Sequence, residues 1–380
     1  MMIELLVLGS LLNTLPGTIE ARQTPLIGAQ ISVLEDDNWQ TCEAYFRELK
    51  NLGYNTIILR VFHNHGDRFH NLVADSVRNQ IHEGVYFKTN KAPLIADILN
   101  PACKSAKRAG LKIFAWMTTL KSNYRQSSKP QVLSFDENRG TIIAEKNLLD
   151  PQASENIIYF KQLFQDLATY PIDGILLQDD LMLRQNQGFS QVNNNFIPKP
   201  NNIYLLPVGS PYKIEGYKAP FYQWRQQQAL QLQDLANQIF ASCRAIKPGL
   251  LCAQNIHYEL LYNADWGLNW FACSLESMQA STADYLMIMA YQEMIQKELE
   301  LADEQLPQTM LKLFKNGRKN DRERIIFKFE IPDQNQPPQA RAKAIRKLKE
   351  TCRSARKAGW QDIVLTPCNS LACAKLLQDK

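Results

Sequence analysis

The chain alternates short apolar runs with longer stretches in which apolar residues recur every three or four positions. Short apolar runs predict buried strands, and the longer periodicity predicts amphipathic helices. Eight strands are expected, at Ile27–Val33, Thr56–Val61, Lys112–Trp116, Gly174–Gln178, Leu250–Gln254, Tyr285–Ala290, Ile325–Glu330 and Asp362–Thr366. Helices are expected at Trp39–Leu52, Ala96–Ala109, Ser154–Tyr170, Tyr217–Ile246, Trp270–Met278, Glu304–Asn316, Pro338–Ala358 and Ser370–Gln378.

Three of the expected helices end at a glycine shortly before a strand, at Gly53, Gly110 and Gly359. Glycine tolerates the left-handed backbone of a helix C-terminus, and the basic residues before Gly110 and Gly359 suit the negative end of the helix dipole. Eight strand–helix units in this order predict an α/β fold of the (β/α)8 TIM-barrel type, with an open doubly wound sheet as the alternative. The barrel is expected to be a single domain over residues 22–380.

Two segments are too long to be simple connections between a strand and a helix. Residues 62–94 follow the second strand, and residues 181–218 follow the fourth. Long loops in compact domains are usually functional. Because both loops leave the carboxyl ends of their strands, both are expected to overhang the face on which α/β barrels carry their active sites.

The composition is that of an ordinary globular protein, with 45% hydrophobic and 21% charged residues in 380. The apolar patch Leu5–Leu12 is too short to cross a bilayer. It suits the apolar part of an export signal over residues 1–21, although Glu4 stands where such signals carry positive charge. We therefore expect a periplasmic or secreted protein, with a cytoplasmic one as the alternative.

The net charge of +5 is unevenly distributed. Residues Met310–Ala358 hold 15 Lys and Arg against 5 Asp and Glu, many of them in the expected helix Pro338–Ala358. Such a run can bind nucleic acid, but it is more often the solvated face of a helix, and no basic motif rich in aromatic residues accompanies it. We therefore expect no nucleic-acid partner. The eight cysteines lack zinc spacing and are expected to be mostly buried thiols, with one disulfide left open.

The segment Pro171–Leu181 carries the clearest chemical signal. Its apolar run ends abruptly at two adjacent carboxylates, Asp179 and Asp180. Ionised carboxylates avoid a buried interior, so the pair is expected where the strand emerges onto the catalytic face. Successive strand residues point to opposite sides, so one carboxylate is expected to face the cleft and the other to support the loop. The alternative is purely structural, with Asp180 as a helix cap and Asp179 in an ion pair.

Other polar and aromatic residues also follow predicted strand ends. Those expected to contact a substrate are Asp36, Arg60, His63, Trp116, Gln178, Asn255, Tyr291 and Trp270. Aromatic rings cover the apolar faces of sugars, and glycoside hydrolysis canonically needs two carboxyl groups, one of them a proton donor. We expect Asp179 or Asp180 to be the acid, with a slight preference for Asp179. The second carboxylate is expected to be Asp36, Glu293 or Glu330.

The stretch His63–His70 holds three histidines and an aspartate. Metal ligands can cluster in this way, but the spacing matches no standard site, and substrate contact or solvent exposure is the better interpretation. No glycine-rich phosphate loop, serine elbow or Cys/His nucleophile pattern is present. No metal or cofactor is therefore expected.

Several of these segments resemble one known family. They are Asn55–Phe62, Val85–Asn90, Leu111–Met117, Asp173–Asp180, Gln254–Asn255, Trp270–Phe271 and Met287–Ala290. Together they are similar to the PgaB-type glycoside-hydrolase domains, a group of barrel glycosidases whose hallmark resembles Asp173–Asp180. Gln178 stands where that family usually has a histidine.

The resemblance implies a periplasmic hydrolase of partly de-N-acetylated poly-β-1,6-N-acetylglucosamine, a biofilm exopolysaccharide. It also implies proteins of exopolysaccharide synthesis or export as partners. A non-catalytic polysaccharide-binding barrel is the alternative, because it keeps the aromatic residues and the acidic cleft. An enzyme for a phosphorylated substrate is less favoured, because the sequence offers no phosphate site.

Overall fold

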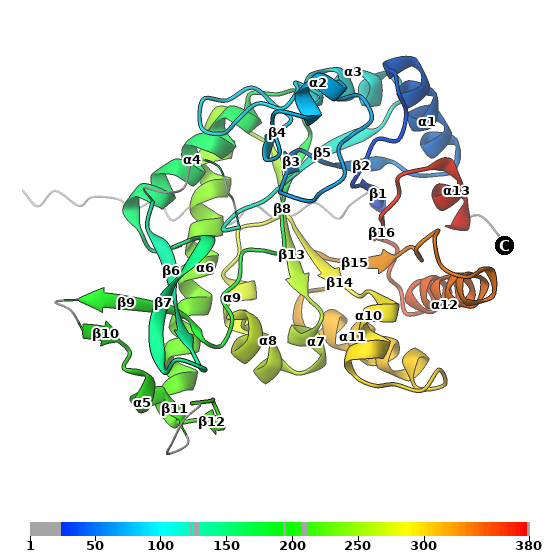
Figure 1. Ribbon diagram of the computed structural model, residues 1–380. Helices are drawn as coiled ribbons and strands as arrows, with labels where there is room; N and C mark the ends of the chain where they lie inside the picture. Colours follow the sequence, from blue (N-terminus) through cyan, green and yellow to red (C-terminus); the bar gives the residue numbers. More distant parts are fainter. Residues whose placement is uncertain (1–23, 122–123, 125–128, 193–194, 207–211, 378–380) are drawn as a thin grey trace, which may run out of the picture.

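Eight parallel strands close into a barrel, and helices surround it (Figure 1). The computed structural model describes residues 24–121, 124, 129–192, 195–206 and 212–377, so the expected export segment 1–21 lies outside the described residues. The barrel strands are β1 (Ile27–Ile31), β2 (Thr56–Arg60), β5 (Lys112–Met117), β8 (Gly174–Leu177), β13 (Leu251–His257), β14 (Tyr285–Met289), β15 (Ile325–Glu330) and β16 (Ile363–Thr366). Each pairs in parallel with its neighbours, and β1 closes the ring by pairing with both β2 and β16. The predicted TIM barrel is confirmed.

The larger helices lie outside the strands, as their apolar faces require. They are α1 (Trp39–Asn51), α3 (Leu99–Arg108), α4 (Ser154–Ala168), α6 (Ala219–Ile246), α11 (Leu306–Asp321) and α12 (Pro338–Lys357), and the short α13 (Leu371–Ala374) follows β16. Gly53, Gly110 and Gly359 adopt positive φ angles of 88°, 71° and 88° just after α1, α3 and α12, as expected for helix ends. No described helix is long and apolar enough to span a membrane. All eight cysteines are free thiols.

Side chains that point into the barrel fill it in layers. One buried apolar cluster consists of Leu26, Ile58, Phe114, Leu176, Ala253, Tyr285, Met287, Ile326 and Val364. Because side chains on one face of a strand recur every second residue, the next inward positions are two residues further along each strand. Four of these positions carry Trp116, Gln178, Asn255 and Lys328. The apolar interior therefore ends in a polar layer below the carboxyl-end rim.

The helix expected at Trp270–Met278 is instead the end of one helix and a second short one. The helices after β13 are α7 (Glu259–Tyr262), α8 (Ala264–Phe271) and α9 (Leu275–Gln279). Ala272 has a left-handed backbone with φ of 48°, and Ser274 begins α9 with a capping box. The side-chain hydroxyl of Ser274 satisfies a free N–H at this start, which favours a new helix over continuation. After β14, α10 (Gln292–Glu298) is a further helix that the sequence pattern did not reveal.

An additional antiparallel sheet stands beside the barrel, built from two loops (Figure 1). Its strands are β6 (Gln131–Asp136) and β7 (Thr141–Leu149) after β5, and β9 (Gln187–Val192) and β10 (Asn195–Ile197) after β8. β6 pairs with both β7 and β9, so the two loops form one sheet. Most of β7 is exposed or half-buried, so its sequence lacks the apolar alternation that predicts a strand.

Smaller elements complete the two long loops that were expected to overhang the catalytic face. The loop after β2 contains β3 (Phe62–His63), α2 (Asp75–Arg78) and β4 (Gly84–Val85). The loop after β8 also contains α5 (Pro200–Ile203), β11 (Tyr204–Leu205) and β12 (Gly216–Tyr217). Neither loop is structureless, because each pairs its own short strands.

The first residue of β8 should accept no side chain. A Cβ on Gly174 would lie 2.6 Å from the ring of Phe114 in the barrel interior. We expect Gly174→Ala to lower the free energy of unfolding by about 1–3 kcal/mol, because overpacking forces rigid neighbours apart. Denaturant unfolding measures this. Gly216→Ala is the matched control, since its Cβ would meet only the tip of Leu205 at 3.4 Å. Equal stability of the two variants would contradict this packing.

Candidate active site

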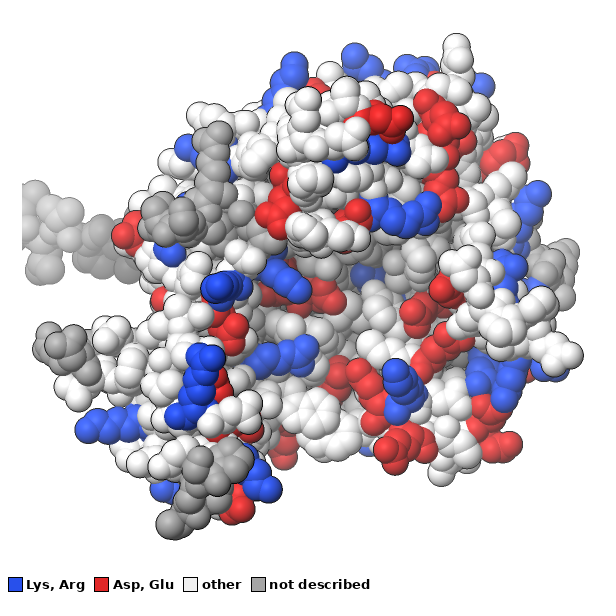
Figure 2. Space-filling model, in the orientation of Figure 1, with Lys and Arg blue, Asp and Glu red and all other residues white. Residues whose placement is uncertain are grey.

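A cleft of about 420 Å³ lies at the carboxyl ends of the strands. Figure 2 shows this face hollowed at its centre, with acidic and basic side chains together in the hollow. The cleft is lined by Asn64, Thr118, Lys121, Gln178, Asp179, Asp180, Met182, Arg184, His257, Glu259, Phe271, Met294 and Glu298. Five of these residues follow β8 directly or lie shortly after it. The segment that gave the strongest sequence signal therefore forms a large part of the cleft wall.

Asp179 is half-buried in this wall, and its charge influences the pKa values of three other side chains. The backbone carbonyl of Asp179 lies 3.3 Å from His257 Nε2, which can only donate to it. Burial lowers the pKa of His257 to about 4, and the negative charge of Asp179 opposes this shift. Burial likewise lowers the pKa of Lys328 to about 7, again opposed by Asp179. Burial and the charge of Asp179 both raise the pKa of Tyr291.

Asp180 has a different environment, because hydrogen bonds occupy both of its carboxylate oxygens. Oδ2 accepts from Thr118 Oγ1 at 2.7 Å and from the Lys121 backbone N–H at 2.7 Å. Oδ1 accepts from Thr119 Oγ1 at 2.7 Å, and the Thr119 N–H lies within 3.0 Å of both oxygens. Burial raises the pKa of Asp180, and hydrogen bonds from Thr119 and Thr118 lower it. The Asp180 carboxylate thus holds the loop after β5.

Glu259 is the carboxyl group of the cleft that sequence reasoning missed. It begins α7 two residues after β13, and only 3% of its surface is exposed. Its Oε2 atom is buried without a hydrogen-bond partner. Burial raises the pKa of Glu259 to about 7, and the nearby charge of Glu298 adds to this. The signal was available, because Glu259 closely follows a predicted strand end, but the residue expected to act at that strand end was Asn255.

Aromatic and amide groups complete the cleft. The ring of His257 stacks on Phe271 with centroids 3.9 Å apart and planes 7° apart, and the Arg184 guanidinium lies 4.9 Å from the Phe271 centroid. Trp116 Nε1 donates to Gln178 Oε1 at 2.5 Å, which fixes the Gln178 amide at the cleft. Trp270 is not among the lining residues: it is 38% exposed and stacks on Trp266 at 4.9 Å.

Other polar side chains pair in the polar layer of the barrel, outside the lining of the cleft. Lys328 Nζ donates to Asn255 Oδ1 at 2.8 Å, and both residues are buried. The Lys328 ammonium lies 5.8 Å from the centroid of the Tyr291 ring. Asn255 and Tyr291, both expected to contact a substrate, thus lie beside Lys328 and do not line the cleft.

Arg60, the last residue of β2, and His63, in the loop after it, are both buried and do not line the cleft. Arg60 Nη1 pairs with Asp67 at 3.2 Å. His63 Nδ1 lies 2.9 Å from the Tyr86 hydroxyl, and its ring stacks on Phe69 at 3.8 Å. Burial lowers the pKa of His63 to about 4. Among the described residues, no group of three or more His, Cys, Asp or Glu side chains could hold a metal ion.

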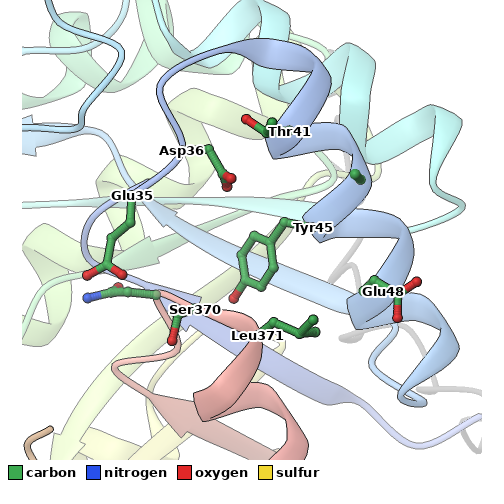
Figure 3. Close-up of a pocket in the computed structure, with 9 residues that line it drawn as sticks. Glu35, Asp36, Thr41, Tyr45, Glu48, Ser370 and Leu371 are labelled. Atoms are coloured by element: carbon green, nitrogen blue, oxygen red, sulfur yellow. The ribbon is translucent and has the colours of Figure 1, made fainter.

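Three expected carboxylates lie in other pockets. Asp36 points into a separate pocket of about 380 Å³ between α1 and the segment that carries Ser370 (Figure 3). Glu330 lines a neighbouring cavity of about 310 Å³, and burial, together with Glu293, raises its pKa to about 7. Glu293 lines a groove beside α12 and accepts a hydrogen bond from Gln336 at 3.0 Å. None of the three lines the cleft that contains Asp179.

A family model described as hypothetical glycosyl hydrolase family 13 (GHL13) matches residues 47–364. Among solved structures, the PgaB (BpsB) glycoside hydrolase domain from Bordetella bronchiseptica is similar over 93% of this chain and 98% of that one, with 16% identity and a TM-score of 0.67. No curated protein matches the chain.

Two other solved barrels are similar at lower identity. An endo-1,4-β-mannanase from Rhizomucor miehei has a TM-score of 0.55 at 11% identity, covering 92% of this chain and 87% of that one. The catalytic domain of a β-amylase from Paenibacillus polymyxa has a TM-score of 0.52 at 13% identity, covering 90% and 92%. These likenesses support the barrel fold.

Removing the carboxylate of Asp180 should weaken the loop that it holds. We expect Asp180→Ala to lower the free energy of unfolding by about 3 kcal/mol or more, because buried donors on Thr118, Thr119 and Lys121 lose their acceptor. Denaturant unfolding at neutral pH measures the loss. Asp75→Ala on the exposed helix α2 is the control and should change stability by less than about 0.5 kcal/mol. Similar values for both variants would contradict a structural role for Asp180.

Glu259 should make the protein less stable as the pH rises. Its pKa is about 7 when folded, against 4.5 for the ordinary group, so its neutral form is favoured by folding. Below pH 4.5, Glu259 is protonated in both the folded and the unfolded protein. Between pH 4.5 and 7 it ionises in the unfolded chain while it is still protonated in the folded protein, so the folded protein loses stability. We expect Glu259→Gln to be more stable than the wild type by about 3 kcal/mol at pH 8 and unchanged at pH 4. A pH-independent difference would show that Glu259 is not buried in this way.

Proposed function

The chain belongs to the hypothetical glycosyl hydrolase family 13, and we propose that it hydrolyses an amino-sugar polysaccharide in the cleft that contains Asp179. One observation carries this proposal: two carboxyl groups of different character, Asp179 and Glu259, line the same cleft. They follow β8 and β13, which are neighbours in the barrel. Glycosidases canonically work with two such groups on either side of the scissile bond.

The different environments of the two carboxyl groups support different catalytic roles. Glu259 has its pKa raised to about 7 by burial, so it keeps a proton near neutral pH and can act as the general acid. Asp179 is half-buried, whereas only 3% of Glu259 is exposed, so Asp179 is the more open of the two groups and suits the role of nucleophile or base. Although the sequence favours Asp179 slightly as the acid, the two environments support the opposite assignment.

Hydrolysis then proceeds with the atoms of one water molecule divided between the products. Glu259 gives its proton to the glycosidic oxygen as the bond from C1 to that oxygen breaks. The Asp179 carboxylate either attacks C1 or takes a proton from the water that attacks it. The hydroxyl of the water ends on C1, and its remaining proton restores the carboxyl groups to their starting state.

The lining of the cleft supports a sugar polymer that carries free amines. Asp179 and Glu298 attract ammonium groups, and the cavity lined by Glu330 and Glu35 adds further acidic surface. Phe271 and His257 offer flat apolar rings, while Lys121 and Arg184 can donate to hydroxyl and acetyl oxygens. These groups and the family resemblance favour partly de-N-acetylated poly-β-1,6-N-acetylglucosamine, with proteins of exopolysaccharide synthesis or export as partners.

Product analysis by mass spectrometry tests this function. The purified protein should convert partly de-N-acetylated poly-β-1,6-N-acetylglucosamine into short oligomers. We expect Asp179→Asn and Glu259→Gln each to reduce the cleavage rate by about 100-fold or more, since each removes one half of the acid and base pair. Asp75→Asn is the control for an exposed carboxylate and should cleave at the wild-type rate.

The possible outcomes separate the candidate functions. Intact polymer with retained binding would favour the non-catalytic polysaccharide-binding barrel. Neither cleavage nor binding would show that the polymer is wrong. Cleavage that survives in both variants would show that the reaction occurs away from Asp179 and Glu259.

A further inference from the structure

Arg225 carries a guanidinium group in a fully buried position. It lies on α6, and 0% of its surface is exposed. Burying a charge is costly unless ion pairs or hydrogen bonds compensate for it. Among the described residues, the hydrogen bonds of this guanidinium go to neutral oxygens, most of them backbone carbonyls. Burial lowers the pKa of Arg225 to about 9, so the group that holds these carbonyls still carries its charge at neutral pH.

The carbonyl groups belong to two segments that reach the cleft. Arg225 Nη2 donates to Leu183 O at 2.6 Å and Nη1 to Arg184 O at 3.1 Å, both in the loop after β8. Arg225 Nε donates to Leu268 O of α8 at 3.2 Å. Because a guanidinium is planar and presents its donors in a rigid fork, it holds these carbonyls at a fixed separation. Arg225 therefore joins the loop after β8 to α8 without lining the cleft itself.

Gln228, one turn further along α6, extends this contact. It is also buried; its Oε1 accepts from Arg225 Nη1 at 2.5 Å, and its Nε2 donates to Gln187 O at 2.9 Å. The loop approaches so closely that a Cβ on Gly188 would collide with Gln228 Nε2, and Gly188 has a φ of 91°. Glycine alone suits both conditions. The loop backbone is thus fitted to Arg225 and Gln228, which we call the α6 clamp.

Each segment held by the α6 clamp places a side chain in the cleft. Arg184 and Phe271, the last residue of α8, both line it. The Arg184 guanidinium lies 4.9 Å from the centroid of the Phe271 ring, within the range of a cation–π contact. The Leu183 N–H donates to Phe271 O at 3.4 Å, so the two segments also meet directly. A shift of either segment would therefore separate the Arg184 charge from the aromatic ring.

We infer that Arg225 is a positioning residue that fixes Arg184 against Phe271 and so sets how tightly the cleft binds a sugar chain. This inference rests on the proposed hydrolysis and extends it to a residue outside the cleft. Arg184 donates to sugar oxygens, and the Phe271 ring lies against an apolar sugar face. The α6 clamp takes no part in proton transfer, because neither of its residues lines the cleft. Its loss should therefore weaken binding and leave the chemical step unchanged.

Hydrogen exchange measured by mass spectrometry tests the α6 clamp without any substrate. Arg225→Lys keeps the charge but loses the planar fork, so the N–H groups of residues 183–188 should exchange about tenfold faster. Arg324→Lys is the matched control, because Arg324 also donates to two backbone carbonyls, on residues that do not line the cleft. It should leave exchange in residues 183–188 unchanged. Gln228→Met should accelerate the same exchange and guards against a failure of the Arg225 variant to fold.

A double-mutant cycle in polymer cleavage tests the consequence for binding. Arg225→Lys and Arg184→Ala should each raise KM about tenfold, near the contribution of one hydrogen bond to a charged group, and change kcat less than about twofold. In the Arg184→Ala background, Arg225→Lys should raise KM no further, because Arg225 acts through Arg184. Arg324→Lys should keep the wild-type KM. A merely structural role of Arg225 would reduce the amount of folded enzyme, and with it the apparent kcat, but not change KM.

The outcomes separate the inference from the proposed function. Faster exchange in residues 183–188, together with a KM that responds through Arg184, supports the inference. Unchanged exchange overturns it, whether or not the protein cleaves the polymer, and so do additive effects on KM or a lower kcat at constant KM. If the polymer is bound but not cleaved, its dissociation constant replaces KM in the same cycle. Faster exchange in a protein that neither binds nor cleaves the polymer overturns the proposed function and, with it, the role of Arg225 in sugar binding.

Discussion

The parallel closure of eight strands is the constraint on which the rest of the structure depends. Because every strand enters from the same end, the residues that follow them converge on one rim. Asp179 and His257 are far apart in the chain, yet His257 Nε2 lies 3.3 Å from the Asp179 carbonyl oxygen in the wall of one cleft. The same closure fixes the inward positions, so the change from apolar to polar layers occurs at one depth on several strands. A cleft lined by charged side chains at the carboxyl ends of the strands follows directly from this arrangement.

The site concentrates groups that a stable interior would avoid. Glu259 is buried with an unpartnered oxygen, and Lys328 is buried beside an amide. Both have pKa values shifted to about 7 in opposite directions by the same cause, burial. Functional sites commonly contain groups with shifted pKa values. Burying such groups lowers the stability of the fold, but it gives them protonation states at neutral pH that they would not have in water. Asp180 contrasts with them, since donors on the loop after β5 surround its carboxylate.

Much of the architecture could be predicted from the sequence, because buried parallel strands are short apolar runs and glycines mark the helix ends. All eight barrel strands were expected close to their observed positions, and Asp179 was expected at the rim. The sheet beside the barrel could not be predicted, because the mostly exposed β7 has no apolar alternation. Lys328 was also missed, because inside an apolar strand only the three-dimensional structure reveals that it is buried and bonded to Asn255.

The candidate residues show the same limit. Arg60 ends β2 and His63 follows it, but contacts with Asp67 and Tyr86 of the loop after β2 keep both side chains buried. Asp36 lines a separate pocket beside α1 and not the cleft. Proximity to a strand end therefore selects residues that can reach the face, whereas the packing of each loop decides which side chains enter the cleft. Glu259 enters it because α7 begins immediately after β13.

The central claim is that Asp179 and Glu259 act together on a glycosidic bond in this cleft. A crystal structure of the Glu259→Gln variant with a bound amino-sugar oligosaccharide tests it most directly. The account predicts the glycosidic oxygen within hydrogen-bond distance of residue 259 and the anomeric carbon facing the Asp179 carboxylate. An oligosaccharide bound in the pocket beside Asp36, or in the cleft with its linkages away from both residues, would contradict it.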